Sequence, residues 1–293
     1  MKKSKKNTHQ KDRKIVDILG IDMDSTELVE VLAGVEEKIS DSCKFYIVTP
    51  NPELVLSATK NPALKQAMNS ADFAIPDGIG LAQAAKFLSL PAPRNFPARL
   101  FTTFFQGLAV GFSTFFSQKW LTDYLEITKG RELFLDLVKL AHKKDWRMFF
   151  LGGLDNEAEL SAKKLGARFA KGPKLDNNAN PISEVDTKLY IDIVKKINSF
   201  RPHLLFVAFG NPKQEIWIYK NLSKLSIDGV MAVGGSFRYV AGLSKLPPKW
   251  MEGLGLEWVW RLITEPSRIR RIFNAWPIFP LKVWMYKLSQ TRV

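Results

Sequence analysis

The feature that most constrains the fold is an apolar run that stops at a glycine. Leu204 to Gln214 read LLFVAFGNPKQ. A continuous apolar run is typical of a parallel strand buried on both faces, and α/β proteins bind ligands at the carboxyl ends of such strands. Gly210 lets the backbone approach a ligand closely, and Pro212 suits the first position of a helix. The junction therefore predicts a strand, then a helix whose first amides face an anion.

The same alternation recurs along the chain. Strand-like runs lie at 44–49, 72–76, 147–151, 204–209 and 230–233, and helical patterns lie at 53–70, 81–88, 131–142, 156–169 and 187–200. Strands that alternate with helices of about ten residues or more form a mostly parallel sheet covered on both faces. We therefore predict an α/β protein with a Rossmann-like sheet.

The charge balance predicts a polyanionic partner. The 293 residues include 43 Lys and Arg against 29 Asp and Glu, a formal net charge of +14. Nucleic acid, an anionic membrane surface or phosphorylated substrates would suit this excess, and a solvated basic surface is the simpler alternative. The single cysteine, Cys43, excludes an internal disulfide and any multi-cysteine metal site, and we expect a buried thiol.

Three segments flank or interrupt the α/β domain, which we place at residues 15–242. Residues 1–14 are basic and lack the apolar stretch of a secretory signal, which predicts a disordered arm able to touch anionic lipid. An apolar insertion is predicted at about 93–125, and its segment 100–118 carries no charge. A membrane-interface or re-entrant hairpin is the first interpretation. Buried helices or a homo-oligomer contact come second, and a true span comes last.

The third segment is the tail, residues 243–293, which we expect to form a helical appendage. It interleaves aromatic and basic side chains: Trp250, Trp258, Trp260, Trp276 and Trp284 with Arg261, Arg268, Arg270, Arg271, Lys282 and Lys287. This mixture suits association with an anionic membrane. It also suits a groove for single-stranded nucleic acid, or a cap whose tryptophans enter the core.

Candidate functional groups follow the predicted strand ends, which a parallel sheet brings to one edge. Asp77 is the acid we favour as a catalytic base, because the neighbouring glycines leave room for a substrate. The alternative is that Asp77 caps the next helix. The other candidates are Thr49, Asn51, Gly152, Gly153, Gly210, Lys213 and Gln214.

Several common chemistries lose support. The chain contains neither the spaced GxGxxG fingerprint nor a P-loop, which argues against an ordinary dehydrogenase, a kinase or an ATPase. His9, His142 and His203 lie far apart, so a histidine metal site or a Ser-His-Asp triad is not expected. Asp22 and Asp24 are better read as a carboxylate-rich edge or a helix start than as metal ligands.

These segments together resemble the WecG/TagA/CpsF glycosyltransferases, glycosyltransferase family 26. The resemblance covers roughly 15–90 and 126–271. It rests on six motifs in order: TPNPELV at 49–55, ADFAIPDGIG at 71–80, FLGG at 150–153, GNPKQEIWI at 210–218, GGSFRYVAG at 234–242 and PPKWMEGLGLEWVWRLITEPSRIRR at 247–271.

The resemblance implies an inverting sugar transferase at the cytoplasmic face of the membrane. It would move N-acetylmannosamine, or a related sugar, from a UDP donor to undecaprenyl-diphosphate-linked N-acetylglucosamine, for teichoic-acid or surface-polysaccharide synthesis. Asp77 would be the base, and no metal or other cofactor is expected. The pocket would be lined by Thr49, Asn51, Gly152, Gly153, Gly210, Lys213 and Gln214, and the tail would bring Arg261, Arg268 and Arg271 to the phosphates.

This chain departs from the family pattern at three positions. Arg238 stands where the family usually has an acid, His203 where it usually has Asp, and Ile127 where an arginine is expected, with Lys129 or Arg131 as substitutes. The rival interpretations are a soluble nucleotide-sugar-binding protein, a family member that lost its activity, and a nucleic-acid-binding module that uses the tail.

Overall fold

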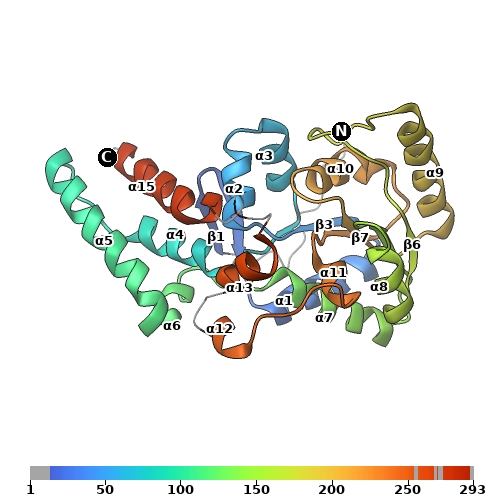
Figure 1. Ribbon diagram of the computed structural model, residues 1–293, viewed down its shortest axis with the longest axis horizontal. Coiled ribbons are helices and arrows are strands. Elements are labelled where there is room, and N and C mark those ends of the chain that lie inside the picture. The colour runs from blue at the N-terminus through green and yellow to red at the C-terminus, as the bar shows by residue number, and fades with distance from the viewer. Residues whose placement is uncertain (1–13, 254–256, 267–268, 270–272, 291–293) are drawn as a thin grey trace.

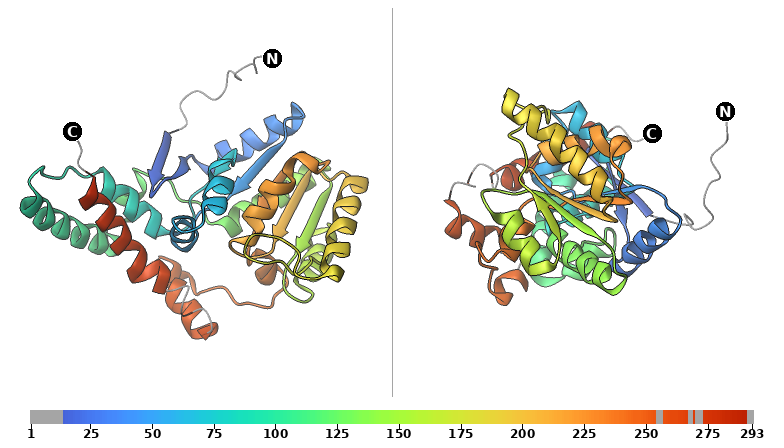
Figure 2. Two further views of the ribbon diagram at one scale, coloured as in Figure 1. Left: turned by 90° about the horizontal axis from the view of Figure 1, so that it is seen from above. Right: turned by 90° about the vertical axis from the view of Figure 1, so that its right-hand side faces the viewer.

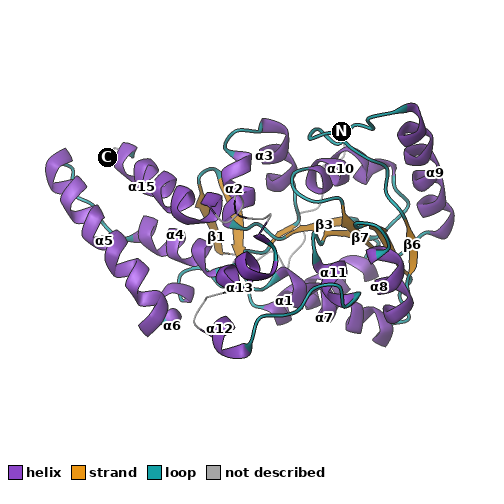
Figure 3. Ribbon diagram, in the orientation of Figure 1, coloured by secondary structure: helices purple, strands orange, loops and turns teal. Residues whose placement is uncertain are grey.

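The computed structural model describes residues 14–253, 257–266, 269 and 273–290. In this part of the chain, six parallel strands form one sheet in the order β4-β3-β8-β7-β5-β6. The strands are β3 (Phe45–Val48), β4 (Phe73–Ala74), β5 (Met148–Gly152), β6 (Arg168–Ala170), β7 (Leu204–Ala208) and β8 (Gly229–Ala232). The α/β class with a parallel sheet is confirmed (Figure 1, Figure 3).

The strands are apolar throughout because both faces of the sheet are covered. In β3, Tyr46 and Val48 enter one hydrophobic core, and Phe45 and Ile47 enter the other. Successive side chains of a strand point to opposite faces, so a strand between two cores needs an unbroken apolar run.

Helices form a layer on each face, as Figure 3 shows. One core includes residues of α2 (Pro52–Ala58), α3 (Pro62–Asn69), α4 (Ile79–Ser89), α9 (Glu184–Phe200) and α10 (Lys213–Asn221), the last followed by η1 (Leu222–Lys224). The other includes residues of α1 (Leu28–Ser40), α7 (Gly130–Lys143), α8 (Glu157–Leu165) and α11 (Ser236–Val240). The expectation of helices on both faces is therefore confirmed.

Four local predictions were wrong or incomplete. An antiparallel hairpin of β1 (Lys14–Ile18) and β2 (Ile21–Ser25) precedes the sheet and was not predicted, so Asp22 and Asp24 lie on a strand. The helix expected at 53–70 is two helices, because Asn61 caps α3 and Pro62 opens it. The helix expected at 156–169 ends at Leu165, and β6 follows. Cys43 is exposed rather than buried.

The apolar insertion forms one long helix. α5 (Phe96–Phe116) contains both Gly107 and Gly111, so the hairpin interpretation is wrong, and α6 (Gln118–Thr122) follows it. One side of α5 is buried, and its other side exposes a stripe of large apolar residues: Leu100, Phe101, Phe104, Phe105, Leu108, Phe112, Phe115 and Phe116. No helix among the described residues has both the length and the apolarity needed to cross a membrane.

The described part of the tail is mostly helical from Lys249 onward. It contains α12 (Lys249–Gly253), α13 (Glu257–Thr264), a kinked turn η3 (Asn274–Ile278) and α15 (Phe279–Ser289). α15 packs on α4 and α5, and the three helices lie at the opposite end of the molecule from α9 (Figure 1, Figure 2). Phe279 and Val283 enter the core, so part of the tail is an integral cap on the α/β domain.

The guanidinium of Arg99 joins the two outer helices. This buried side chain on α5 donates hydrogen bonds to the main-chain carbonyls of Leu288 (2.9 Å) and Gln290 (3.3 Å), at the end of α15. It also donates to the carbonyls of Pro93 and Arg94 just before α5.

Candidate functional site

The candidate residues gather at the carboxyl edge of the sheet. β3 leads to Thr49, β4 to Asp77, β5 to Gly153, β7 to Gly210 and β8 to Gly234. Because all these strands are parallel, their following loops meet along one edge, as the sequence predicted. Two backbone hydrogen bonds join the loops after β3 and β4 to each other and to the segment before α7: Asp77 N–H donates to the Pro50 carbonyl (2.7 Å), and Thr128 N–H to the Pro76 carbonyl (3.0 Å).

Thr49 and Asp77 come together at the start of α7. A Cβ placed on Gly130, the first residue of α7, would lie 2.9 Å from Thr49 Oγ1 and 3.2 Å from Asp77 Oδ2. A hydroxyl and a carboxylate from different strand ends thus face the same glycine, at the positive end of the helix dipole. Gly78, not Asp77, caps α4. The helix-cap alternative for Asp77 is therefore wrong.

Asn51 has a structural role at the same edge. Its Oδ1 accepts a hydrogen bond from Leu54 N–H (2.9 Å), which caps α2. This bond fixes the turn between Thr49 and α2. A role of Asn51 in substrate binding stays a prediction.

Glycines shape the loops after β5 and β7. A Cβ on Gly152 would lie 2.8 Å from the carbonyl oxygen of Ala208, so a larger residue would force the two loops apart. Gly210 has a φ of +75°, which favours glycine. A Cβ there would meet nothing within 4 Å, so the turn borders open space. The next residue, Asn211, has a buried Oδ1 with no hydrogen-bond partner among the described residues.

Gln214 links the turn after β7 to the turn after β8. Its buried side chain accepts a hydrogen bond from Gly234 N–H (3.1 Å) and donates to Glu215 Oε1 (2.7 Å). Glu215 is also buried, near Tyr46 on β3. Burial, and secondly the charge of Glu215, raise the pKa of the Tyr46 phenol well above its usual range. The amide of Gln214 therefore has a fixed orientation beneath the edge.

The ammonium of Lys213 points to a neighbouring loop. Its Nζ donates to the carbonyl of Leu175 (2.6 Å), which ties the 172–182 loop to α10. A phosphate contact by Lys213 would require this bond to be exchanged. Its place among the substrate-binding residues stays a prediction.

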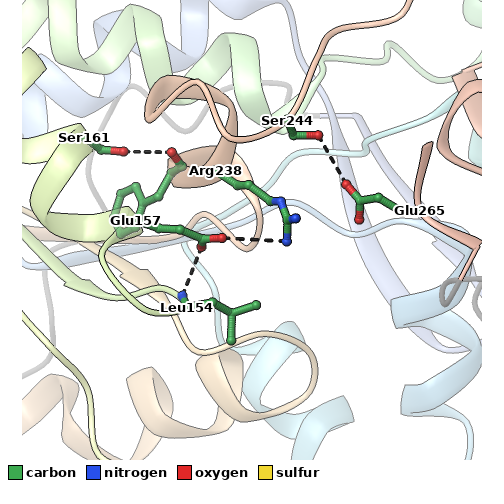
Figure 4. Close-up of polar contacts among 7 residues, drawn as sticks. Leu154, Glu157, Ser161, Arg238, Ser244 and Glu265 are labelled. Atoms are coloured by element: carbon green, nitrogen blue, oxygen red, sulfur yellow. Dashed lines mark hydrogen bonds and ion pairs between the residues drawn. The ribbon is translucent and has the colours of Figure 1, made fainter.

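Arg238 lies on α11 beside the turn after β5. Its Nη1 is 3.9 Å from Oε1 of the buried Glu157, whose Oε2 accepts a hydrogen bond from Leu154 N–H (3.0 Å). Figure 4 shows the Glu157 carboxylate between these two partners. Ser161 Oγ also donates to the Phe237 carbonyl (2.8 Å) and fastens α8 to α11. The positive charge of Arg238 is thus matched by a buried carboxylate.

Ile127 and His203, the other two positions where this chain departs from the expected pattern, lie in different parts of the fold. Ile127 packs against the core next to the loop that contacts Pro76, so it lies close to Asp77. His203 lies just before β7, at the amino edge of the sheet and thus opposite the candidate site. There its Nδ1 accepts a hydrogen bond from Arg147 N–H (2.8 Å). Burial and the nearby Arg147 charge lower the pKa of His203.

Lys129 and Arg131, the proposed substitutes for the arginine expected at position 127, each have a partner nearby. Lys129 Nζ is 3.9 Å from Glu132 Oε1, and the Arg131 guanidinium lies 5.3 Å from the centre of the Tyr239 ring. Of the tail arginines, Arg261 lies on α13, but its side chain is outside the described part of the chain. Arg268 and Arg271 also lie outside the described residues.

Sequence reasoning missed three residues at this edge. Gly130 lies between the candidates Lys129 and Arg131, but only the fold shows that it faces Thr49 and Asp77. Asn211 was part of the opening motif without a role of its own. Glu157 had no sequence signal, because its partner Arg238 is distant in the chain. Among the described residues, no group of three or more His, Cys, Asp or Glu could hold a metal ion.

Comparisons with known proteins agree with these motifs. The model of the family described as "Glycosyl transferase WecG/TagA/CpsF family" matches residues 16–117 and 107–293. Curated relatives from Staphylococcus aureus strains NCTC 8325 / PS 47, COL and MSSA476 are 28% identical over 284 residues, which covers 94% of this chain and 93% of each relative. Each is named N-acetylglucosaminyldiphosphoundecaprenol N-acetyl-beta-D-mannosaminyltransferase.

Proposed function

The chain belongs to the WecG/TagA/CpsF glycosyltransferase family, and we propose that it transfers N-acetylmannosamine, or a closely related sugar, from a UDP donor to undecaprenyl-diphosphate-linked N-acetylglucosamine. The name of the curated relatives supports the acceptor and the transferred sugar. The product would feed teichoic-acid or another surface-polysaccharide synthesis.

The observation that carries this proposal is the meeting of Thr49 and Asp77 at Gly130. A sugar transferase needs a base close to the acceptor hydroxyl and room for a sugar ring beside it. Asp77 provides a carboxylate on a strand-end loop held by two backbone hydrogen bonds. Gly78 beside it and Gly130 opposite it carry no side chain that would crowd this carboxylate.

In the proposed reaction, the Asp77 carboxylate accepts the proton of the acceptor hydroxyl. The hydroxyl oxygen forms a bond to the anomeric carbon of the donor sugar. The bond from that carbon to the diphosphate oxygen breaks, and UDP leaves with the electron pair. Attack from the face opposite the leaving group inverts the configuration at the anomeric carbon. Thr49 lies close enough to Asp77 to hold the acceptor in place.

The turns after β5, β7 and β8 would hold the nucleotide. Gly210 borders open space and would let the nucleotide approach closely, whereas Gly152 and Gly153 pack against neighbouring protein atoms and would shape the turn. Asn211 Oδ1, which is buried and has no hydrogen-bond partner among the described residues, would accept a hydrogen bond from a sugar or base that reaches it. Gln214 would fix the floor of this site through Gly234. Main-chain amides and the cations Lys213, Arg261, Arg268 and Arg271 would stabilise the diphosphate, and transfer would need no metal.

We place the enzyme at the cytoplasmic face of the membrane as a peripheral protein. A polyprenyl-linked acceptor resides in the bilayer, and α5 exposes its apolar stripe on the outer side of the molecule. Apolar side chains of this kind stabilise contact with a lipid surface, and basic residues add attraction to anionic headgroups.

The test is transfer of labelled sugar from UDP-N-acetylmannosamine to a diphosphate-linked N-acetylglucosamine on a short isoprenoid chain. The wild type should form the disaccharide lipid with inverted configuration. Asp77→Asn should lower kcat by about 10²- to 10⁴-fold, the usual contribution of a general base. Asp192→Asn, an exposed residue on α9, serves as the matched control with unchanged kcat.

Two results would decide against the proposal in different ways. Wild-type turnover in Asp77→Asn would remove the role of Asp77 as the base. Tight UDP-sugar binding by the wild type without transfer to any acceptor would favour a nucleotide-sugar-binding protein or an inactive family member.

A further inference from the structure

An apolar groove lies between α4, α5 and the C-terminal segment. Its volume is about 330 Å³, and its lining includes Gly80, Phe87, Val110, Trp276 and Trp284. Three of these are aromatic and one is aliphatic, so the groove suits a hydrocarbon better than a sugar or a nucleotide.

Three polar groups of the lining, the Gln83 amide nitrogen, the Thr103 hydroxyl and the Trp284 indole nitrogen, already have partners. Gln83 Nε2 donates to Thr114 Oγ1, and Thr103 Oγ1 accepts a hydrogen bond from Trp284 Nε1 (2.9 Å) and donates to the Arg99 carbonyl (2.8 Å). A ligand in the groove therefore has no hydrogen bond to satisfy at these positions. Displacing water from such a surface favours an apolar occupant.

One end of the groove lies next to the candidate active site. Gly80, in the first turn of α4, is the third residue after Asp77. A Cβ on Gly80 would lie 3.0 Å from Pro52 Cγ, at the start of α2. The C-terminal turn η3 also contacts α2. The groove thus begins where the strand-end loops meet.

The groove continues onto the exposed apolar stripe of α5. Phe104 and Leu108 belong to both, because they line the groove and remain exposed. Phe101, Phe105 and Phe112 extend the same surface along α5. An extended hydrocarbon could therefore pass from this surface to the neighbourhood of Asp77 without crossing a polar barrier formed by these residues.

We infer that this groove binds the first isoprene units of the lipid-linked acceptor and thereby presents its diphosphate sugar to Asp77. This inference rests on the proposed function. A cavity of about 150 Å³ holds benzene, a six-carbon molecule. The groove is about twice as large and would hold on the order of two to three five-carbon isoprene units. The rest of the chain would lie along α5 and in the bilayer.

The first experiment measures binding alone, by equilibrium dialysis with radiolabelled isoprenyl diphosphates of five, ten, fifteen and twenty carbons. Affinity should rise by at least about tenfold up to fifteen carbons and then level off, since additional units extend beyond the groove. Gly111→Trp should abolish this rise, because Gly111 lines the groove and faces open space. Ala109→Trp, on the same helix but outside the lining, is the matched control.

The second experiment measures transfer to acceptors with a three-unit isoprenoid or with a short water-soluble alkyl group. Gly111→Trp should raise KM for the isoprenoid acceptor at least about tenfold and leave the alkyl acceptor unaffected. Circular dichroism and thermal unfolding establish that both tryptophan variants fold.

The outcomes separate this inference from the proposed function. Length-dependent binding that Gly111→Trp abolishes supports the groove even if no sugar is transferred. Transfer with the same KM for both acceptors in the wild type and in Gly111→Trp overturns it. Equal binding of hexadecyl phosphate would also overturn it by indicating a site for bilayer acyl chains. So would a dimer that Gly111→Trp dissociates, because the groove would then be a contact between copies.

Discussion

Gly130→Ala is the most informative single substitution, because it removes no functional group. The new methyl group would lie 2.9 Å from Thr49 Oγ1, whereas ordinary contact begins at 3.4 Å. The neighbours must therefore move by roughly half an ångström, the difference between the two distances. Asp77 Oδ2, at 3.2 Å, lies on the same side and would move too.

The expected cost appears in catalysis rather than in folding. A misplacement of about 1 Å can cost about 10²-fold in rate, so half of it should lower kcat roughly tenfold, or about 1.4 kcal/mol. In the middle of a helix, alanine is more stable than glycine by about 0.5–1 kcal/mol, and at Gly130, the first residue of α7, this is the upper limit of the gain. This gain offsets part of the clash, so Tm should change by no more than about 4 °C.

The assay combines steady-state transfer kinetics with thermal unfolding. Gly34→Ala is the matched control, because its Cβ would also lie close to a neighbour, 3.1 Å from the Phe73 ring, but on α1 in the core. That variant should lose stability and keep its kcat. A Gly130→Ala enzyme with wild-type kcat, or one that loses activity only in proportion to its unfolded fraction, would refute the placement of the reaction at Gly130.

Three further predictions concern other parts of the molecule. Gln214→Ala should lower the free energy of unfolding by about 1–3 kcal/mol, because Gly234 N–H loses its buried acceptor; Gln66→Ala, which removes an exposed hydrogen bond, should cost less in the same denaturant titration. His203 has a lowered pKa in the folded state, so its contribution to stability is complete above about pH 6.5 and falls as the pH drops through the folded-state pKa. His203→Asn should therefore show a smaller fall in Tm between pH 7.5 and 5, and equal falls would contradict this reasoning. Phe112→Ser with Phe116→Ser should reduce sedimentation with anionic liposomes at least about tenfold, since each phenyl group contributes about 1.5–3 kcal/mol when buried; unchanged sedimentation would exclude α5 as the membrane contact.

The central sheet could be predicted because its strands are buried on both sides. Phe45 to Val48 and Leu204 to Ala208 are apolar at every position, and each residue enters one of two cores. Once the strands are parallel, topology alone brings Thr49 and Asp77 to one edge. Their approach to Gly130 could not be predicted, because it depends on how α7 packs beneath the sheet.

Three of the local predictions failed, each for a different reason. Asn61-Pro62 is a cap and helix start, yet the apolar spacing on both sides of it suggested one helix. The uncharged segment 100–118, of moderate hydrophobicity, was interpreted first as a membrane-interface or re-entrant hairpin, but residues 100–116 lie within the continuous α5 helix. Cys43 lies between the turn after α1 and the start of β3. It is therefore exposed, although the strand residues that follow it are apolar and buried.

The hydrogen bonds from Arg99 to the end of α15 limit which changes this segment tolerates. The acceptors are carbonyl oxygens of Leu288 and Gln290, and every amino acid carries such an oxygen. Replacement of either side chain therefore leaves the attachment in place, whereas a chain terminated before residue 288 removes both acceptors of Arg99 Nη1 and leaves only the Pro93 and Arg94 carbonyls to this guanidinium. An insertion within the final turn of α15 would break this attachment, whereas a change of side chain at either position would not.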